Sequence, residues 1–208
     1  KGVFRSKDRG ETWEALNDAE AGKEVWSLVI HPDNPNVILA GYDPCSISRS
    51  QDGGDTWEMM DTSAVVYPHI TTYMAPTGKR VIGMSFDPSN TQDIYAAIEV
   101  GGLLASRDGG ETWEAINNGL LHKTVWSIVQ HQETGDLYVG SSPASIFVSK
   151  DQGDSWVEHS AIELMPETKD WTGPVPPHVS RMKGIALTRG AQPIIYGAIE
   201  EGWAVRSL

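Results

Sequence analysis

The sequence of 208 residues contains a single cysteine, Cys45, so the chain cannot form an internal disulfide. It has no run of 18 apolar residues, which argues against a membrane-spanning helix. No stretch of about ten residues has the apolar spacing of an amphipathic helix, so we do not expect a helical fold. Basic residues are also few, because 16 Lys and Arg stand against 28 Asp and Glu. Binding to nucleic acid or to an anionic membrane needs clustered Lys and Arg, and the net charge of −12 argues against both.

Four octapeptides of the chain share one pattern: Ser6–Trp13, Ser50–Trp57, Ser106–Trp113 and Ser149–Trp156. The shared pattern is Ser-x-Asp-x-Gly-x-Thr/Ser-Trp. In a tight turn the Asp accepts hydrogen bonds from backbone N–H groups, and the Gly takes the positive φ that reverses the chain. The Thr or Ser then starts an outgoing strand, and the Trp buries a large ring. We therefore predict a hairpin at each copy and a structural role for its aspartate, namely Asp8, Asp52, Asp108 and Asp151.

The spacing of the octapeptides predicts a duplication. Their first residues are separated by 44, 56 and 43 residues, and Arg206-Ser207 resembles the beginning of a fifth copy. The short and long spacings alternate, which gives a period of roughly 100 residues. Val25-Trp26-Ser27 and Val125-Trp126-Ser127 repeat at the same interval. We predict a repeated unit of two sheets over approximately residues 6–105 and 106–206.

The segments between octapeptides predict strands. Val25–Ile30 is an apolar run rich in β-branched residues, and the turn formers of Pro32–Asn36 end it. Each octapeptide is preceded by a further strand and followed by an outer one, so most sets have four strands. The expected sets are 25–30, 37–41, 46–50 and 56–60; 81–86, 93–98, 103–106 and 112–116; 125–130, 136–140, 145–149 and 155–159; and a partial set at 184–188, 193–199 and 203–207.

These octapeptides are Asp-boxes, and the chain resembles the Asp-box (BNR-repeat) β-propeller proteins, which include sialidases, sortilin-type receptors and xyloglucanases. The resemblance implies an all-β fold, a β-propeller of four-stranded antiparallel blades with Asp-box hairpins. It also implies that the boxes lie on the rim, away from the mouth that binds ligands. At roughly 40–45 residues a blade, residues 1–208 form a single β-propeller region covering about four blades. We expect a partial or fragmentary propeller; a compact four-blade ring, or two chains pairing into eight blades, are the alternatives.

The loops opposite the boxes are where we expect binding groups. Asp61–Arg80 and Ser160–Met182 are the long inter-blade connections, at equivalent positions of the two units. These loops, a shorter connection and the turns after the second strands supply the ligand-binding candidates. They are His69, Tyr73, Arg80, His122, Trp171, His178, Arg181 and Tyr42.

The chemistry of these candidates leaves alternatives open. His69, His122 and His178 are weak candidates for a metal site, because His is a common ligand but no short spacing such as His-x-x-x-His is present. We expect no cofactor, with a metal ion as the alternative. Glu99 and Glu200 are candidates for a catalytic acid–base pair. The competing interpretation is that all these side chains cap loops and satisfy backbone groups.

The tryptophans outside the octapeptides fall into a loop residue with two interpretations and two predicted core residues. Trp171 lies in a Pro-rich loop, where it either stacks on a sugar ring or a partner's side chain or packs against its own fold. Trp26 and Trp126 lie inside apolar inner strands, and we expect both in the core.

The functional prediction is a non-catalytic propeller that recognises a protein, peptide or glycan at its mouth. The alternative is a glycoside hydrolase that uses mouth carboxylates such as Glu99 and Glu200. A sialidase is not expected, because the chain lacks the Phe/Tyr-Arg-Ile-Pro motif and the arginine cluster that a sialic-acid carboxylate requires. We expect neither nucleic-acid binding nor membrane insertion, and self-association if the propeller is incomplete. The sequence does not distinguish a cytoplasmic from an exported protein.

Overall fold

The structure is a computed structural model that describes residues 2–16, 20, 22–63, 65, 79–159, 162 and 164–207. The predicted site residues His69 and Tyr73 lie outside these ranges. Within them the regular elements are strands, apart from one short 3-10 helix, η1 (Pro166–Asp170). No helix in the described part of the chain is long and apolar enough to cross a membrane.

The strands form five antiparallel sheets in chain order. The first pairs β1 (Phe4–Arg5) with β2 (Glu14–Ala15). The second contains β3 (Glu24–Ile30), β4 (Ile38–Asp43), β5 (Ile47–Ser50) and β6 (Glu58–Met59). The third contains β7 (Val81–Phe86), β8 (Ile94–Ile98), β9 (Gly102–Ser106) and β10 (Glu114–Ala115). The fourth contains β11 (Val125–Gln130), β12 (Leu137–Ser141), β13 (Ile146–Ser149) and β14 (Val157–Glu158). The fifth contains β15 (Arg181–Leu187), β16 (Ile195–Glu200) and β17 (Ala204–Arg206).

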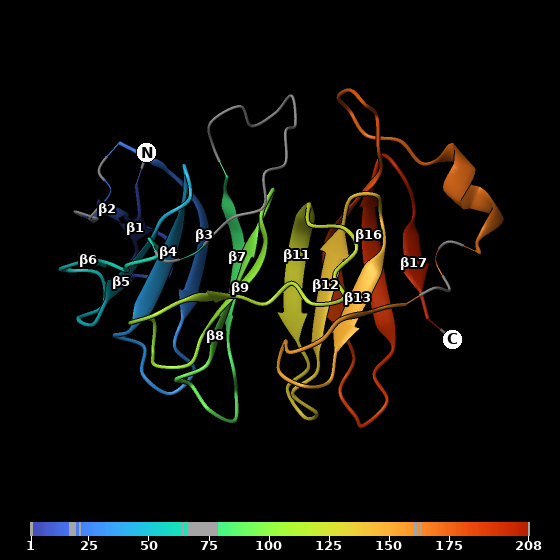
Figure 1. The fold of residues 1–208 in the computed structure, drawn as a ribbon. Helices are drawn as coiled ribbons and strands as arrows, with labels where there is room; N and C mark the ends of the chain where they lie inside the picture. Colours follow the sequence, from blue (N-terminus) through green and yellow to red (C-terminus); the bar gives the residue numbers. More distant parts are fainter. Residues whose placement is uncertain are drawn as a thin grey trace.

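The sheets, called blades below, lie side by side in chain order (Figure 1), and their inner strands meet as β3 with β7, β7 with β11 and β11 with β15. The predicted inner strands at 81–86 and 125–130 are confirmed. The predicted outer strands were too long, since each has two residues instead of five. The reason is visible at Thr112, whose backbone N–H donates to Asp108 within the turn and is not available to the sheet.

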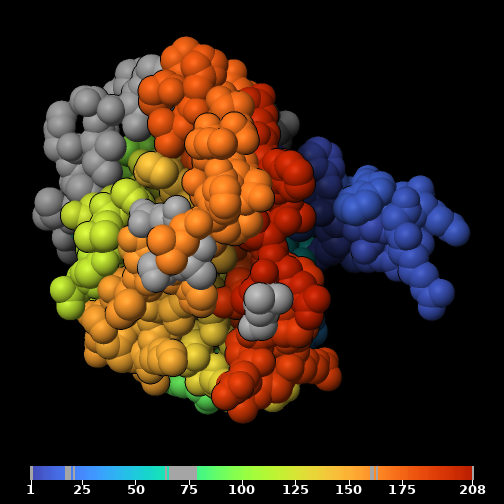
Figure 2. All heavy atoms as spheres, turned by 90° about the vertical axis from the view of Figure 1, so that its right-hand side faces the viewer, coloured from blue at the N-terminus to red at the C-terminus, as the bar shows by residue number. Residues whose placement is uncertain are grey.

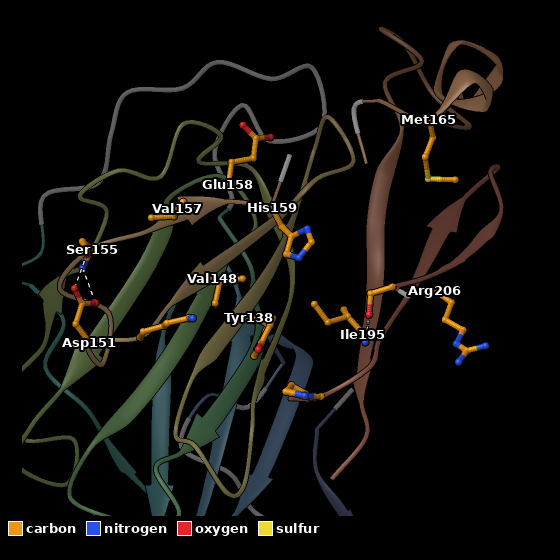
Figure 3. Close-up of a pocket in the computed structure, with 13 residues that line it drawn as sticks. Tyr138, Val148, Asp151, Ser155, Val157, Glu158, His159, Met165, Ile195 and Arg206 are labelled. Atoms are coloured by element: carbon orange, nitrogen blue, oxygen red, sulfur yellow. Dashed lines mark hydrogen bonds between the residues drawn. The ribbon is translucent and has the colours of Figure 1, made fainter. Parts of the chain in front are cut away.

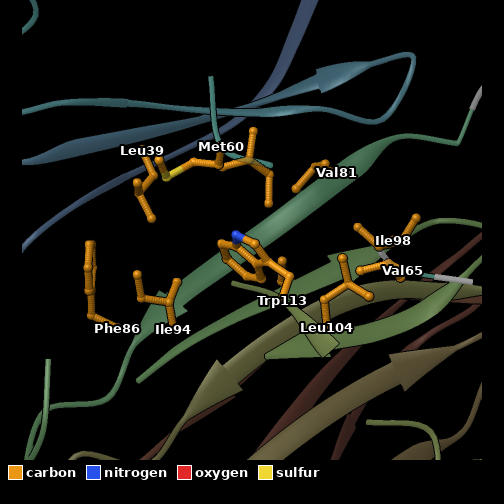
Figure 4. Close-up of a cluster of buried hydrophobic side chains, with 11 residues drawn as sticks. Leu39, Met60, Val65, Val81, Phe86, Ile94, Ile98, Leu104 and Trp113 are labelled. Atoms are coloured by element: carbon orange, nitrogen blue, oxygen red, sulfur yellow. The ribbon is translucent and has the colours of Figure 1, made fainter. Parts of the chain in front are cut away.

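The apolar core lies between blades rather than inside them. One cluster joins Leu39 and Met60 of the second blade to Ile94, Leu104 and Trp113 of the third (Figure 4). Trp113 is only 6% exposed. A single four-stranded sheet cannot bury both of its faces, so each blade depends on its neighbours for stability.

Every inner strand carries an irregularity at the same place. The pairing register shifts between Val25 and Ser27, Val81 and Gly83, Val125 and Ser127, and Met182 and Gly184. A bulge of this kind turns the extra residue away from the ladder. The residues at these bulges are Trp26, Ile82, Trp126 and Lys183.

Trp26 and Trp126, the tryptophans at these bulges, are the two that we predicted to lie in the core. Trp126 is 9% exposed and fits this prediction, but the prediction was wrong for Trp26, which is 41% exposed. The first sheet has only β1 and β2 among the described residues, so no inner strand there covers the outer face of β3. Leu28 and Ile30, on the same face of β3, are 50% and 58% exposed.

Candidate functional site

The aspartates of the octapeptides close turns. Asp108 Oδ1 accepts hydrogen bonds from Ser106 Oγ (2.8 Å) and from the Thr112 N–H (2.9 Å), and its Oδ2 accepts from Thr112 Oγ1 (2.6 Å). The hydroxyl and amide of Thr112 lower the pKa of Asp108 to about 2, because they stabilise the charged carboxylate. The same bonds recur at the other three copies, at Asp8, Asp52 and Asp151.

These turns lie at one end of the blades and the candidate site at the other. Asp108 follows the end of β9, whereas Glu99 precedes the beginning of β9. The end that carries Glu99 also carries the starts of β7, β11 and β15 and the ends of β8, β12 and β16, and is called the mouth below.

The first group at the mouth is built around Arg80. Its Nη1 donates to Glu99 Oε2 at 3.1 Å, and its Nε donates to Asp43 Oδ2 at 2.8 Å. The guanidinium carbon lies 4.3 Å from the ring centroid of Trp26. A cation at this distance is attracted by the negative face of the indole. Arg80 is thereby held by two carboxylates and one aromatic ring.

The second group repeats the first. Arg181 Nη1 donates to Glu200 Oε2 at 2.9 Å, directly across the β15–β16 ladder. Its guanidinium carbon lies 4.7 Å from the ring of Trp126, and Lys183 Nζ lies 3.9 Å from the same ring. The bulges described above place Trp26, Trp126 and Lys183 in these groups.

Burial sets the direction of the pKa shift of two groups at the mouth, Glu99 and Lys183. Glu99 is 2% exposed, and burial raises the pKa of its carboxyl although Arg80, Lys183 and Arg181 act in the opposite direction. Burial also lowers the pKa of Lys183. For Arg80, burial lowers the pKa, but its bond to Asp43 and the charge of Glu99 outweigh burial, so the pKa is raised.

A pocket of about 200 Å³ opens beside the second group. Its walls are Glu99, Trp126 and Arg181, together with apolar residues from the ends of β8 and β12 and from the loop before β15. The latter are Val100, Pro143, Pro176, Pro177 and Val179. A larger cavity of about 940 Å³ lies away from the mouth, between β13–β14 and β16–β17.

His122 and His178, the two histidine candidates that the structure describes, each make a separate contact. His178 is exposed and its Nδ1 lies 2.8 Å from the Gly173 carbonyl oxygen, so it closes its own loop. His122 packs edge-on against Phe147. Within the described residues, no group of three or more His, Cys, Asp or Glu is placed to hold a metal ion.

Two aromatic candidates also lie outside the pocket walls. Trp171 is 8% exposed and packs in a cluster with Ile199, so its ring is not available for stacking on a ligand. Tyr42 is fully buried, and its hydroxyl lies 2.8 Å from Ser48 Oγ. Among the described residues, the two ion pairs at the mouth comprise four predicted residues, namely Arg80, Glu99, Arg181 and Glu200. The prediction missed the roles of Trp26 and Trp126, although both precede the arginines by a similar interval, 54 and 55 residues.

No family model matches the chain. A curated relative, the oligoxyloglucan-reducing end-specific xyloglucanase of Emericella nidulans, is 28% identical over 134 residues, which are 54% of this chain and 15% of the relative. The structure of YCF48 bound to D1 peptide superposes with a TM-score of 0.61 at 14% identity, over 99% of this chain and 59% of that chain. An ancestral GH74 enzyme gives 0.60 at 17% identity, over 99% of this chain and 28% of that chain.

The fold is a β-propeller. Four-stranded antiparallel blades and the likeness to GH74 enzymes and YCF48 agree on this assignment. The GH74 enzyme of Niastella koreensis, with a TM-score of 0.60 and 17% identity, covers 99% of this chain, and the chain spans 34% of that enzyme. Likenesses at such identities concern the fold, and the chain covers a minor part of the enzymes it resembles.

Proposed function

We propose that this chain belongs to a non-catalytic β-propeller that binds a protein, peptide or glycan at the mouth, and that its octapeptides are Asp-boxes of the BNR-repeat type. The observation that carries the proposal is the state of the two mouth carboxylates. Glu99 is held by Arg80 and Glu200 by Arg181. A carboxylate oxygen that accepts a hydrogen bond from a guanidinium is less available to attack a substrate or to take up its proton.

The mouth is nevertheless suited to binding. It presents Arg80, Arg181 and Lys183 beside indole rings and an apolar pocket, on a chain whose net charge is −12. Arginines and aromatic rings are enriched where proteins bind partners. YCF48 is a propeller-like neighbour whose structure holds a D1 peptide, which is consistent with a peptide ligand. Binding of this kind requires no cofactor.

The alternative is glycoside hydrolysis, favoured by the likeness to xyloglucanases. The raised pKa of Glu99 is a property that general acids share. In that case Glu99 would donate the proton and Glu200 would act as the second carboxylate.

A binding experiment tests the proposal. The chain is applied to a peptide array and to immobilised xyloglucan oligosaccharides, and the affinity of each positive probe is measured in solution. Arg80→Gln and Arg181→Gln are expected to weaken binding at least about tenfold. Arg189→Gln, an exposed arginine in the turn after β15, is the matched control and should bind as the wild type does. An affinity that neither mouth substitution changes would place the ligand elsewhere and contradict the proposal.

A further inference from the structure

The two charged groups at the mouth differ at one position. In the β-ladders of the second and fourth blades, Tyr42 and Ser141 pair with the valines that precede the bulges. The residues that follow them, Asp43 and Ser142, therefore occupy equivalent places, and a proline comes next in both. In the first group the Asp43 carboxylate accepts from Arg80 Nε at 2.8 Å. At the same place the second group has a serine, which carries no charge.

The arginine of the second group consequently keeps donors that its counterpart uses. Arg181 Nη1 donates to Glu200, and in the described part of the chain Arg181 makes no other hydrogen bond or ion pair. A guanidinium carries five N–H donors in a planar fork that matches a carboxylate. Arg181 is buried, so few of these donors reach bulk water. The side chain is therefore able to hold a second carboxylate, as Arg80 does.

The second group also has more positive charge than the first. Lys183 occupies the bulge position that Ile82 has in the third blade. Its Nζ lies 3.9 Å from the ring centroid of Trp126, and it forms no ion pair with the described residues. The first group thus has one cation and two carboxylates, a formal charge of −1, whereas the second has two cations and one carboxylate, a formal charge of +1. This difference favours an anionic ligand at the second group.

The mouth pocket of about 200 Å³ lies at this place, because Ser142 and Arg181 both line it. Trp126 also lines it, and its buried Nε1 has no acceptor in the described part of the chain. Pro176 and Pro177 add apolar wall from the loop before β15, and the orange residues of this segment lie at the top of Figure 2, the end that carries the mouth. Pockets for drug-sized ligands measure about 300–1,000 Å³, so this one suits a single side chain better than a sugar chain.

The larger cavity, of about 940 Å³, lacks this excess of positive charge. Two carboxylates line it together with two cations, and these are Asp151, Glu158, Lys150 and Arg206. Figure 3 shows Asp151 bonded to Ser155 within its own turn. The cavity therefore presents its own carboxylates to a ligand, and we do not expect it to select an acidic one.

We propose that the mouth pocket binds the side-chain carboxylate of an acidic residue in a peptide, at the place that corresponds to Asp43. The carboxylate accepts hydrogen bonds from the Arg181 guanidinium and the Ser142 hydroxyl, and Lys183 adds electrostatic attraction. The apolar walls cover the methylene groups of the ligand side chain. Glu99, which also lines the pocket, already has a guanidinium partner that offsets its repulsion. This inference rests on the proposed function and names the chemistry of the ligand.

A titration with short peptides tests the ligand chemistry. The probes are a capped pentapeptide with one glutamate among alanines, its glutamine analogue, the glutamine peptide with a free carboxyl terminus, and a xyloglucan oligosaccharide. The NMR signal of the Trp126 indole N–H, assigned with Trp126→Phe, reports binding. The capped glutamate peptide is expected to bind at least about tenfold more tightly than the other three probes. Equal affinities, preference for the chain end or the sugar, or no binding of the glutamate peptide would overturn the proposal.

Two substitutions exchange the chemistry of the two groups. Ser142→Asp supplies a carboxylate from the chain itself and should weaken binding of the glutamate peptide at least about tenfold. Gln132→Asp adds the same charge on an exposed turn after β11, at the other end of the blades, and is the matched control. Asp43→Ser should open a second site at Arg80, seen as a shift of the Trp26 indole signal. Unchanged binding by Ser142→Asp, or equal effects of Ser142→Asp and Gln132→Asp, would overturn the proposal.

The failure of this inference is distinguishable from that of the proposed function. A mouth ligand that requires Arg80 and Arg181, but binds Ser142→Asp as it binds the wild type, would overturn the carboxylate pocket and leave the proposed function standing. A ligand whose affinity depends on neither arginine would contradict the proposed function itself.

Discussion

Arg80 donates to the Glu99 carboxylate, and that carboxylate is 2% exposed. The pair joins the start of the inner strand β7 to the end of β8, and the backbone N–H of Glu99 also donates to the Arg80 carbonyl at 2.9 Å. Arg181 and Glu200 repeat the arrangement on the last blade. The recurrence indicates that these ion pairs belong to the framework of the mouth.

The first prediction concerns the removal of Arg80. Arg80→Ala leaves the buried Glu99 without its guanidinium, and breaking a buried pair in this way costs about 3–5 kcal/mol. The free energy of unfolding in urea measures the loss. The double variant Arg80→Ala/Glu99→Gln removes the unpaired charge and is expected to recover part of it. No recovery in the double variant would show that the cost does not come from an isolated charge.

The second prediction concerns acid stability. The pKa of Asp108 is lowered from its ordinary value to about 2, so its contribution to stability is present above pH 4 and is lost as the pH falls toward 2. Asp108→Asn should lower the urea midpoint at neutral pH. It should also flatten the dependence of the midpoint on pH across this window. Parallel pH profiles for the wild type and the variant would contradict the prediction.

The third prediction concerns Glu99, whose contribution to stability changes with pH in the opposite direction to that of Asp108. Burial raises the pKa of Glu99 above its ordinary value of 4.5, so the stability linked to its proton is present below that value and is lost as the pH rises through the folded-state pKa. The stability advantage of the wild type over Glu99→Gln should therefore shrink as the pH rises from 4. Urea unfolding of both proteins at several pH values checks this. An advantage that grows with pH would mean that Arg80 dominates the titration.

The fourth prediction separates two effects of glycine. Gly119 and Gly135 both have positive φ, but a Cβ at Gly119 would lie 2.3 Å from the Trp156 carbonyl oxygen, whereas nothing lies within 4 Å of one at Gly135. Both Ala variants should lose about 1–2 kcal/mol from backbone strain. Gly119→Ala should lose clearly more, because backbone atoms must move. Thermal unfolding of the two variants measures the difference, and equal losses would contradict the packing at Trp156.

The fold was predictable because its signals are local and repeated. The octapeptide fixes a turn through its own side chains, and its four copies mark successive blades. The lengths of the outer strands were overestimated because the backbone N–H groups of Thr112 and its counterparts donate to the turn aspartates instead of to a neighbouring strand. That competition is not visible in apolar patterning.

The site was predictable only in part. Arg80 and Arg181 were predicted from the long inter-blade connections, and Glu99 and Glu200 from the turns after the second strands. The exposure of Trp26 was missed, because it depends on which strands lie beside β3 and not on the residue pattern of β3 itself. Trp171 is buried in a cluster that also contains Ile199, and a Cβ added at Gly202 would meet both side chains. Contacts between residues so far apart in the chain are not visible in a local sequence pattern, so sequence alone left the role of that ring open.

The most direct test asks whether Glu99 and Glu200, the carboxylates paired with arginines at the mouth, catalyse hydrolysis of xyloglucan. The wild-type chain and Glu99→Gln/Glu200→Gln are incubated with xyloglucan, and newly formed reducing ends are counted. We predict no release by either protein above the rate without protein, while the mouth arginines remain necessary for binding. Release by the wild type that disappears in the double variant would establish a hydrolase and contradict a non-catalytic mouth.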